Sequence, residues 1–426
     1  MVGNTSRNQI GIEGANREYE VGRNARVPLP SRLDPNSYLF TAVLGLLAGL
    51  PALSIDLSAP TLPLLPVALG TSETIAGLTL SLFMVGFALG QFGAGRLSDD
   101  RGRRPILLCA LVCFDCSGIG CSLAPTGPIL VLLRFIQGFG AGACSVISFA
   151  MVQDLFAGDV TRAKRSYVAT IFTAVPILAP AAGSALIDVF GWRSVHAVLA
   201  LVGLLLSVVT WFFVGESRAV SEIGGECPHR KYSTRDFTFL RITLANALSY
   251  GVIFVYIAGS PVVIIGKMGY SSTTFAIVFA CTAAALALGA WTNARLSRQG
   301  VRPAALINPA FTTSVAATAA LAFASLSEAS SPGVILPLLM TVLFTRGILA
   351  PNLLHLAIES RHERAGSASA VLGISQLLVG AVASAGVAAM LPAFGANAVA
   401  CTMVFLAIAA LVTWCWRSND LAIAGR

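Results

Sequence analysis

The amino-acid sequence predicts an all-α membrane protein whose twelve transmembrane helices form two pseudo-symmetric six-helix bundles. Three observations lead to this prediction: a low content of charged residues, a series of apolar segments of spanning length, and an uneven distribution of Lys and Arg. Of the residues, 56% are hydrophobic and only 11% are charged, whereas soluble domains carry roughly 25% charged residues. Too little charge is present for a water-exposed surface, so lipid is expected to be the main solvent.

The apolar segments give the number of spans, because a helix needs about 20 apolar residues to cross a bilayer. Six candidate spans precede a polar stretch: Leu39–Leu57, Ile75–Gly93, Ile106–Leu123, Ile129–Val152, Tyr167–Val189 and Val195–Val214. Six more follow it: Ile242–Val263, Thr274–Trp291, Ala304–Leu326, Val334–Ala357, Ser367–Met390 and Ala398–Trp416.

The Lys and Arg residues test this assignment. With the N-terminus placed inside, 24 of the 28 fall in segments predicted to be cytoplasmic. The exceptions are Arg193 and Lys267 in outside loops, and Arg134 and Arg346 within spans. Cytoplasmic loops retain Lys and Arg, so this excess supports both the topology and the number of spans. It also explains the net charge of +8 without a nucleic-acid partner.

The chain is expected to divide into two bundles joined by a linker. The predicted units are a disordered cytoplasmic tail (1–36), a first bundle (37–215), a cytoplasmic linker (216–241), a second bundle (242–417) and a cytoplasmic tail (418–426). The loop Gly95-Arg-Leu-Ser-Asp-Asp-Arg-Gly-Arg-Arg-Pro105 is echoed six spans later by Ala294-Arg-Leu-Ser-Arg-Gln-Gly-Val-Arg-Pro303. This spacing indicates an internal repeat, which is typical of transporters.

Asp56 stands within the first predicted span, between Pro51 and Pro60. A charge inside a span costs about 2.5–3.5 kcal/mol on insertion scales and is a functional hypothesis by default. Burial raises the pKa of a carboxyl group and a nearby cation lowers it, so a group between these influences can exchange a proton near neutral pH. We predict that Asp56 binds protons and substrate; an acid in contact with water at the outer helix end is the alternative.

Arg134 lies in the fourth predicted span, with Gln137 one turn further along. Arginine stays charged, so it cannot carry the proton but can pair with an acid or with substrate oxygens. We predict coupling and substrate binding for Arg134, and substrate binding for Gln137. Asp115, in the third span, is a further candidate for substrate binding that could pair with Arg134, line a cavity or occupy a hydrogen-bonded niche.

The second half supplies four more candidates for substrate binding: Asn246, Tyr250, Tyr256 and Arg346. Arg346 could be a second cation in the cavity or a structural partner. The two tyrosines and Asn246 could line an amphipathic pocket in span seven, although aromatic residues at helical spacing are often packing residues.

The loop between spans two and three is predicted to act in gating. Gly95 and Gly102 are expected to allow a tight turn, and Asp99 could form a charge network with Arg103 and Arg104. Such a network can hold one conformation and release in another, whereas a solvated charge run is the alternative.

Span five carries a second gating candidate. Pro176, Pro180 and Gly183 lie within one apolar segment. Proline removes backbone hydrogen bonds and bends helices, and small residues let a partner helix approach closely. A rocking interface or a static kink could result.

Enzyme signatures are absent from the sequence: no P-loop, nucleophile elbow or zinc-protease motif is present, and the four His are scattered. The C-x-x-C spacing of Cys113 and Cys116 falls within an apolar span, so packing is the favoured interpretation. We expect no cofactor and no metal, and an ion gradient as the source of energy for any uphill transport.

These motifs resemble those of the major facilitator superfamily. The loop Gly95–Pro105 is similar to the signature loop of that superfamily, and four stretches are similar to the twelve-span drug:proton antiporters of the bicyclomycin and chloramphenicol resistance branch. The stretches are Ile55-Asp-Leu-Ser-Ala-Pro-Thr-Leu-Pro63, Leu78–Gln91, Leu133-Arg-Phe-Ile-Gln-Gly138 and Ile177-Leu-Ala-Pro-Ala-Ala-Gly183. Asp100 and Ala179 stand where the family usually has Arg and Gly.

The resemblance implies roles for particular residues. Asp56 matches the acid that family members use for protons and substrate, and Arg134 matches the Arg tied to coupling. Ala179, Pro180 and Gly183 match the antiporter motif, and Asp99, Gly102 and Arg103 match the gating loop.

The expected protein is therefore a proton-coupled exporter of drug-like small molecules, working by alternating access as a monomer in the bacterial inner membrane, with both termini cytoplasmic. Two alternatives stay open from the sequence alone. One is a proton-coupled importer or facilitator of a metabolite, and the other is a non-transporting membrane receptor or scaffold.

Overall fold

The computed structural model describes residues 33–217, 237–327, 331–360 and 365–416. The first half contains α2 (Tyr38–Ser58), η1 (Ala59–Thr61), α3 (Leu65–Leu69), α4 (Glu73–Arg101), α5 (Arg103–Leu123), α6 (Gly127–Leu155), α7 (Gly158–Phe190) and α8 (Trp192–Phe213). The second contains α9 (Phe237–Pro261), η3 (Val262–Lys267), α10 (Ser272–Arg298), α11 (Pro303–Leu326), α12 (Pro332–Glu359), α13 (Ala365–Phe394) and α14 (Ala396–Cys415).

Among the described residues, 12 helices are long and apolar enough to cross a membrane. The predicted all-α fold with twelve spans is confirmed. The helices extend beyond the predicted apolar segments, because hydropathy marks the part within the hydrocarbon and a helix continues into the headgroup region. Most of the predicted N-terminal tail, most of the predicted linker and all of the predicted C-terminal tail lie outside the described residues.

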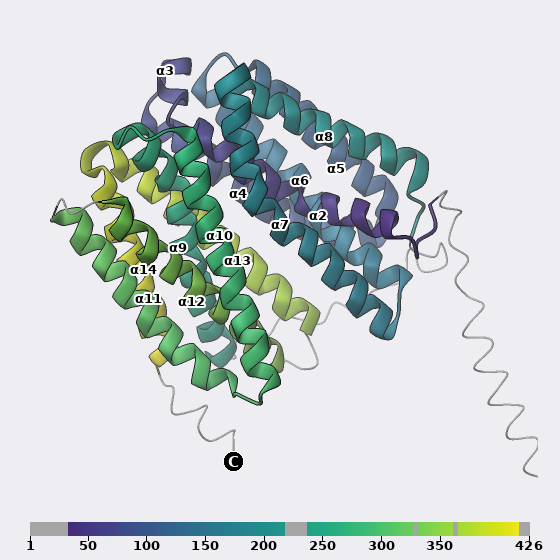
Figure 1. Ribbon diagram of the computed structural model, residues 1–426. Coiled ribbons are helices and arrows are strands. Elements are labelled where there is room, and N and C mark those ends of the chain that lie inside the picture. The colour runs from purple at the N-terminus through teal and green to yellow at the C-terminus, as the bar shows by residue number, and fades with distance from the viewer. Residues whose placement is uncertain (1–32, 218–236, 328–330, 361–364, 417–426) are drawn as a thin grey trace, which may run out of the picture.

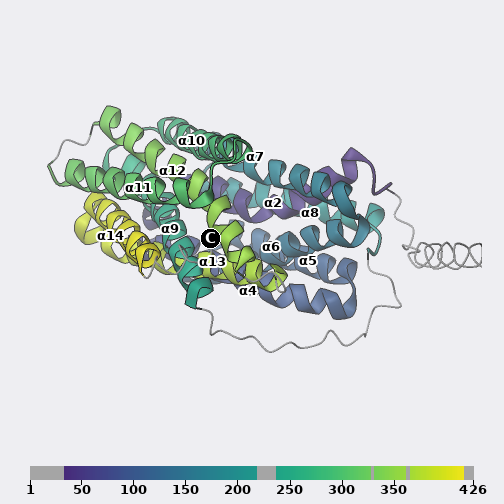
Figure 2. The ribbon, with the colours of Figure 1, turned by 90° about the horizontal axis from the view of Figure 1, so that it is seen from below.

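The two halves form separate groups of helices that lie side by side (Figure 1). They meet where α4 packs against α13 and α7 packs against α10, as the view from below shows (Figure 2). On α4, Gly77 faces Ala388 of α13 so closely that an added Cβ would overlap its side chain. The contact between the halves therefore depends on small residues, as is common where membrane helices pack closely.

Close packing through glycine also holds α4 against α6 within the first half. A Cβ at Gly86 or Gly90 would overlap backbone carbonyls of α6, and one at Gly138 or Gly142 would overlap carbonyls of α4. In the second half α10 and α12 pack in the same way, since Gly289 faces the Phe344 carbonyl and Gly347 the Leu286 carbonyl. The second and fourth spans of each half are thus packed by one shared geometry, as expected of an internal repeat.

Polar contacts between the halves lie at the end of the molecule that bears η1 and α3, called here the α3 end. The Lys267 ammonium lies 3.2 Å from the Glu73 carboxylate. The Ser272 hydroxyl, at the start of α10, donates to the Asp188 carboxylate near the end of α7 at 2.8 Å. In addition, the Ser184 hydroxyl donates to the Ser272 carbonyl at 3.0 Å. By the predicted topology the α3 end is the outer end.

Two boundaries differ from the prediction. Gly95 does not lie in a turn, because α4 continues through it to Arg101 and the turn is made by Gly102 alone, at φ 94°. The predicted linker also ends too late, because residues 237–241 belong to α9. Phe237 packs edge-on against Trp416, and Arg241 donates to the Trp416 carbonyl at 2.6 Å, so packing against the end of α14 extends the helix beyond its apolar core.

Candidate functional site

Asp56 lies in the last turn of α2, directly before the 3-10 turn η1, and only 3% of its surface is exposed. The flanking prolines have different positions: Pro51 is inside α2, and Pro60 is inside η1. The sequence had left open an acid in contact with water at the helix end, but the structure buries it. Pro60 falls at the point where the α-helical hydrogen bonding stops, which places Asp56 at an interruption of the span.

Arg134 reaches α2 on either side of Asp56. Its guanidinium donates to the Ser54 carbonyl at 3.2 Å and to the Ser58 hydroxyl at 3.0 Å. A third hydrogen bond of 2.8 Å reaches the Gln137 side chain, and the guanidinium carbon lies 4.3 Å from the centre of the Phe83 ring. Arg134 is 2% exposed, so a buried cation is held here by neutral acceptors and an aromatic face.

Arg134 of α6 and Asp56 of α2 do not form an ion pair, although Arg134 binds residues on both sides of Asp56 in the sequence. Among the described residues, the ion pairs involve neither of them. An isolated carboxylate is costly to bury in its charged form. The site thus contains a buried acid and a buried cation on neighbouring helices. Ser54 and Ser58, which bind Arg134, are one turn apart and share a face of α2, so Asp56, midway between them, points to another face.

The second half contributes aromatic and cationic side chains: two tyrosines of α9 near Asp56, and Arg346 of α12 beside one of them. Tyr250 and Tyr256 of α9 are both close enough to Asp56 for a Coulombic interaction. The Arg346 guanidinium donates to the Asn246 side chain at 3.0 Å and lies 5.2 Å from the centre of the Tyr250 ring. Arg346 therefore repeats the arrangement of Arg134: each extends from the fourth span of its half to the first span of that half.

Tyr250 and Arg346 line a pocket of about 540 Å³ between α9, α10, α12 and α13. Gln376 and Ser369 of α13 contribute polar groups, and the rest of the wall is mostly apolar. A pocket of this size and chemistry is typical of small-molecule sites, in which a few polar groups orient a largely apolar ligand.

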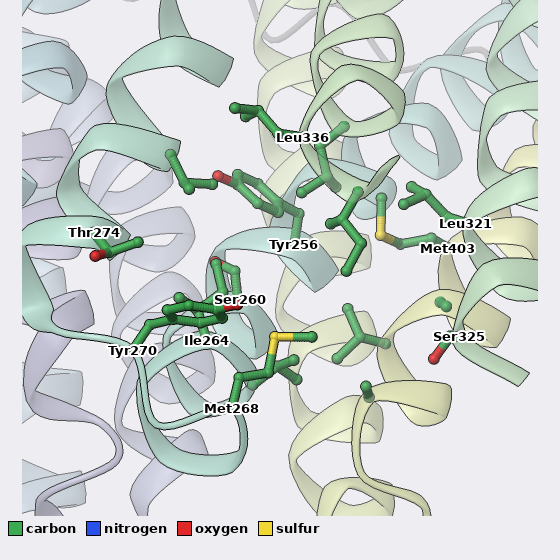
Figure 3. Close-up of a pocket in the computed structure, with 17 residues that line it drawn as sticks. Tyr256, Ser260, Ile264, Met268, Tyr270, Thr274, Leu321, Ser325, Leu336 and Met403 are labelled. Atoms are coloured by element: carbon green, nitrogen blue, oxygen red, sulfur yellow. The ribbon is translucent and has the colours of Figure 1, made fainter. Parts of the chain in front are cut away.

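Tyr256 lines a different pocket from Tyr250. Its hydroxyl is 2.9 Å from the Thr282 hydroxyl, its ring stacks on Phe279, and it lines a different cavity, nearer the α3 end (Figure 3). The structure therefore separates it from the pocket of Tyr250 and Arg346. Two tyrosines six positions apart on a straight helix point in different directions, which explains the separation.

Asp115 also lies apart from Asp56 and Arg134. It occupies a niche between α5 and α8, where the Ser207 hydroxyl donates to one carboxylate oxygen at 2.7 Å. The other oxygen is buried without a partner and packs against Gly203. Of the three settings considered from the sequence, the structure has the hydrogen-bonded niche.

The predicted gating loop forms a charge network inside the first half. The Arg103 guanidinium pairs with Asp99 at 2.7 Å and with Asp154, at the end of α6, at 2.8 Å. The Glu216 carboxylate accepts from the backbone N–H groups of Arg103 and Arg104 at 2.9 and 3.0 Å, and so caps the start of α5. The loop thereby ties α4, α5, α6 and the residues after α8 together.

The fifth span, α7, packs closely against the turn of α2 that carries Asp56. Pro176 and Pro180 lie inside α7, and a Cβ at Gly183 would overlap the backbone carbonyl of Leu57, next to Asp56. The glycine therefore sets how closely α7 approaches the acid-bearing turn of α2.

Sequence reasoning missed the residues that hold the charged groups in place: Ser54 and Ser58 around Arg134, and Asp154 and Glu216 around Arg103. Ser54 and Ser58 are one helical turn apart on either side of Asp56, and that spacing was the available signal. Within the described ranges, His, Cys, Asp and Glu form no group able to hold a metal ion.

A comparison with protein families decides the class of this chain. The sequence model of the family described as Major Facilitator Superfamily matches residues 44–385 of this chain.

The chain belongs to the major facilitator superfamily. It is a multi-pass membrane transporter and not an enzyme. An uncharacterized MFS-type transporter, YdgK of Bacillus subtilis, is 31% identical over 349 residues, which cover 80% of this chain and 86% of the relative.

Two relatives carry names that refer to drug resistance. The chloramphenicol resistance protein of Pseudomonas aeruginosa is 32% identical over 239 residues, covering 56% of this chain and 57% of the relative. The multidrug resistance protein MdtL of Escherichia coli O139:H28 is 30% identical over 239 residues, covering 56% and 58%. The matched region thus spans little more than half of each, and the resemblance to the drug-resistance branch is confirmed at that level.

Solved structures share the fold. The inward open conformation of the xylose transporter XylE from E. coli superposes with a TM-score of 0.71 at 18% identity, covering 89% of this chain and 96% of XylE. A bacterial homolog to human lysosomal transporter Spinster, in inward-facing and occupied conformation, gives 0.69 at 16% identity, covering 92% and 98%.

Proposed function

We propose that this transporter is a proton-coupled drug efflux antiporter of the bacterial inner membrane, working by alternating access as a monomer with both termini cytoplasmic. Asp56 is the proton and substrate site, and Arg134 couples the two. The observation that carries the proposal is the setting of Asp56, which is buried and has no ion-pair partner among the described residues, on the turn of α2 whose Ser54 and Ser58 hold the Arg134 guanidinium.

Coupling follows from the cost of an unpaired buried charge. When Asp56 holds a proton, the α2 turn is neutral and can stay packed among apolar groups. When it loses the proton, the carboxylate needs a cation or a cationic substrate, and the present packing provides no ion-pair partner for it among the described residues. Proton loss therefore changes which packing of α2 is favoured, and this turn is the one that Gly183 of α7 touches.

The pocket of Tyr250 and Arg346 supports the substrate part of the proposal. Its volume of about 540 Å³ suits a drug-sized molecule, and its polar groups are few. Arg346 can donate to an oxygen of the substrate, and the Tyr250 ring offers an apolar face. Drug-resistance proteins among the relatives favour a drug over a nutrient as cargo.

The first test is resistance in a hypersusceptible host that expresses the chain. Asp56→Asn preserves shape but cannot release a proton, so it is expected to abolish the increase in minimal inhibitory concentration for chloramphenicol or another responsive drug. Asp100→Asn is the matched control, because Asp100 is an exposed acid at the end of α4. Full resistance with Asp56→Asn at equal expression would contradict the proposal.

Proteoliposomes separate coupling from translocation and give the direction of transport. Uphill movement of drug driven by a pH gradient should be lost in Asp56→Asn, while exchange of labelled for unlabelled drug without a gradient is retained. Drug movement in the direction of the proton flux would instead favour the importer reading.

A further inference from the structure

A second cavity lies inside the second bundle at the α3 end, apart from the pocket of Arg346. Its volume is about 110 Å³, and its walls come from α9, η3, α10, α11, α12 and α14 (Figure 3). Met268 and Met403 face it together with aliphatic side chains such as Ile264 and Leu336. The wall is therefore apolar and, through its methionines, adaptable in shape.

One buried hydroxyl in this wall lacks a normal hydrogen-bond partner. The Tyr256, Thr274 and Ser325 hydroxyls are bonded to Thr282, Ser271 and Asn397. The Ser260 hydroxyl, in a residue only 5% exposed, has no partner with normal hydrogen-bond geometry and interacts only weakly with the Tyr256 hydroxyl, which is bonded to Thr282. A buried polar group without a partner costs free energy, which a ligand with a complementary group would recover.

Size and polarity together specify the ligand. An apolar cavity of about 150 Å³ in another protein stays dry and accepts benzene. A cavity of 110 Å³ with flexible methionines therefore suits a single six-membered ring, and the Ser260 hydroxyl suits one hydroxyl group on that ring.

The cavity wall is also the segment that touches the first half. Residues 263–274 run from η3 into α10 and supply Val263, Met268, Tyr270 and Thr274 to the cavity. On its other side the same segment carries Lys267, which pairs with Glu73, and Ser272, which donates to Asp188. The local geometry is irregular, since α9 passes at Pro261 into the π-helical turn η3, a feature common at functional sites.

We propose that this cavity is a regulatory binding site for a small phenol-like molecule, and that its occupancy stabilises the contact between the halves at the α3 end. Ser260 is the hydrogen-bonding group and residues 263–274 transmit the effect. The cavity is separate from Asp56, so the result of testing this proposal does not depend on whether the protein is a proton-coupled efflux transporter.

Binding is tested with the full chain in nanodiscs, using 4-fluorophenol observed by ¹⁹F NMR. Saturable binding is expected, with roughly two- to tenfold weaker affinity in Ser260→Ala, since one neutral hydrogen bond is lost. Fluorobenzene, which lacks the hydroxyl, should bind wild type and Ser260→Ala equally.

Blocking variants control for partition into lipid. Ala400→Phe, with Ala400→Leu as a milder version, fills the cavity and should abolish saturable binding. Cys401→Phe adds the same ring at the next position of α14, where the side chain is exposed, and should leave binding unchanged. Equal binding to wild type and both filled variants would overturn the proposal, as would an unchanged affinity of Ser260→Ala for 4-fluorophenol.

Hydrogen exchange tests the link to the contact between the halves. Saturating 4-fluorophenol should slow amide exchange in residues 263–274 of wild type at least twofold and have no effect on Ala400→Phe. Binding without any change of exchange in this segment would refute the regulatory part.

Discussion

At the residue scale, the buried guanidinium of Arg134 is held by geometry and not by a counter-ion. Its two terminal nitrogens donate to three acceptors on α2 and α6, and its flat face lies over Phe83. A planar group with donors in a fixed fork is needed for this arrangement. Any neutral change at α2 that moves Ser54 or Ser58 will therefore move Arg134 as well.

Arg134→Lys tests that reading. A lysine keeps the charge, but its single ammonium cannot reach the Ser54 carbonyl, Ser58 and Gln137 together. Hydrogen bonds to charged groups contribute about 1.5–3 kcal/mol each, so a loss of one should lower the rate of drug transport roughly tenfold or more. Initial rates in inverted membrane vesicles, normalised to protein amount, would measure it.

Arg193→Lys is the control for this change, because Arg193 is exposed, lies in the first turn of α8 and donates to the carbonyl of Ala124, the residue after α5. It should transport at the wild-type rate. Wild-type transport by Arg134→Lys would mean that charge alone suffices at this position.

The sequence could point to Asp56 and Arg134 because a charge within an apolar span is conspicuous. It could not point to Ser54 or Ser58, because hydroxyls and carbonyls that receive a hydrogen bond from another helix depend on how the two helices are rotated. Hydropathy contains no such information. For the same reason the sequence left three settings open for Asp115 and could not show that Tyr250 and Tyr256 line different pockets.

At the element scale, α2 and α7 form the contact that brings the span-five motif to the turn that carries Asp56. Gly183 lies directly against the Leu57 carbonyl, and Ala179, 3% exposed, is one turn before it. The prolines of α7 remove backbone N–H donors from the turns that precede this contact. The helix pair can thus change its packing near Asp56 at low cost in hydrogen bonds.

Gly183→Ala should disturb that contact. The new Cβ overlaps the backbone of α2, which cannot move aside as a side chain could, so we expect a destabilisation of about 1–3 kcal/mol and reduced drug transport. Thermal unfolding of the detergent-solubilised protein and vesicle transport would measure both. Gly386→Ala, with open space around its Cα, should lower neither.

The number of helices was predicted correctly, because it depends on the length of the apolar segments. The ends of the helices were predicted less accurately. Twelve spans follow from hydropathy alone. The prediction of a turn at Gly95 was wrong. The charged residues after Gly93 were interpreted as a loop, whereas they extend α4 by about two helical turns into the polar region. What ends the helix is Gly102, whose positive φ of 94° few other residues adopt easily.

At the scale of the whole molecule, the two halves are joined through small residues along α4 and α13 and through polar contacts at the α3 end. The Lys267–Glu73 ion pair and the Ser272–Asp188 hydrogen bond join exposed groups and are individually weak, which suits the proposed opening of this contact during transport. The packed helix pairs inside each half, by contrast, interlock through backbone and glycine and are expected to move as units.

Charge reversal tests whether the Glu73–Lys267 pair favours closure of the α3 end. An exposed pair contributes about 0.2–1 kcal/mol, so Lys267→Glu should raise the open population by a factor of roughly 1.5 to 5. Spin labels at positions 67 and 394, where Val67 is 91% and Phe394 60% exposed, would report longer distances in a background without native cysteines. The double variant Glu73→Lys/Lys267→Glu restores the attraction and should return the distances to those of the parent. A double variant that stays as open as the single one would show that the pair does not govern closure.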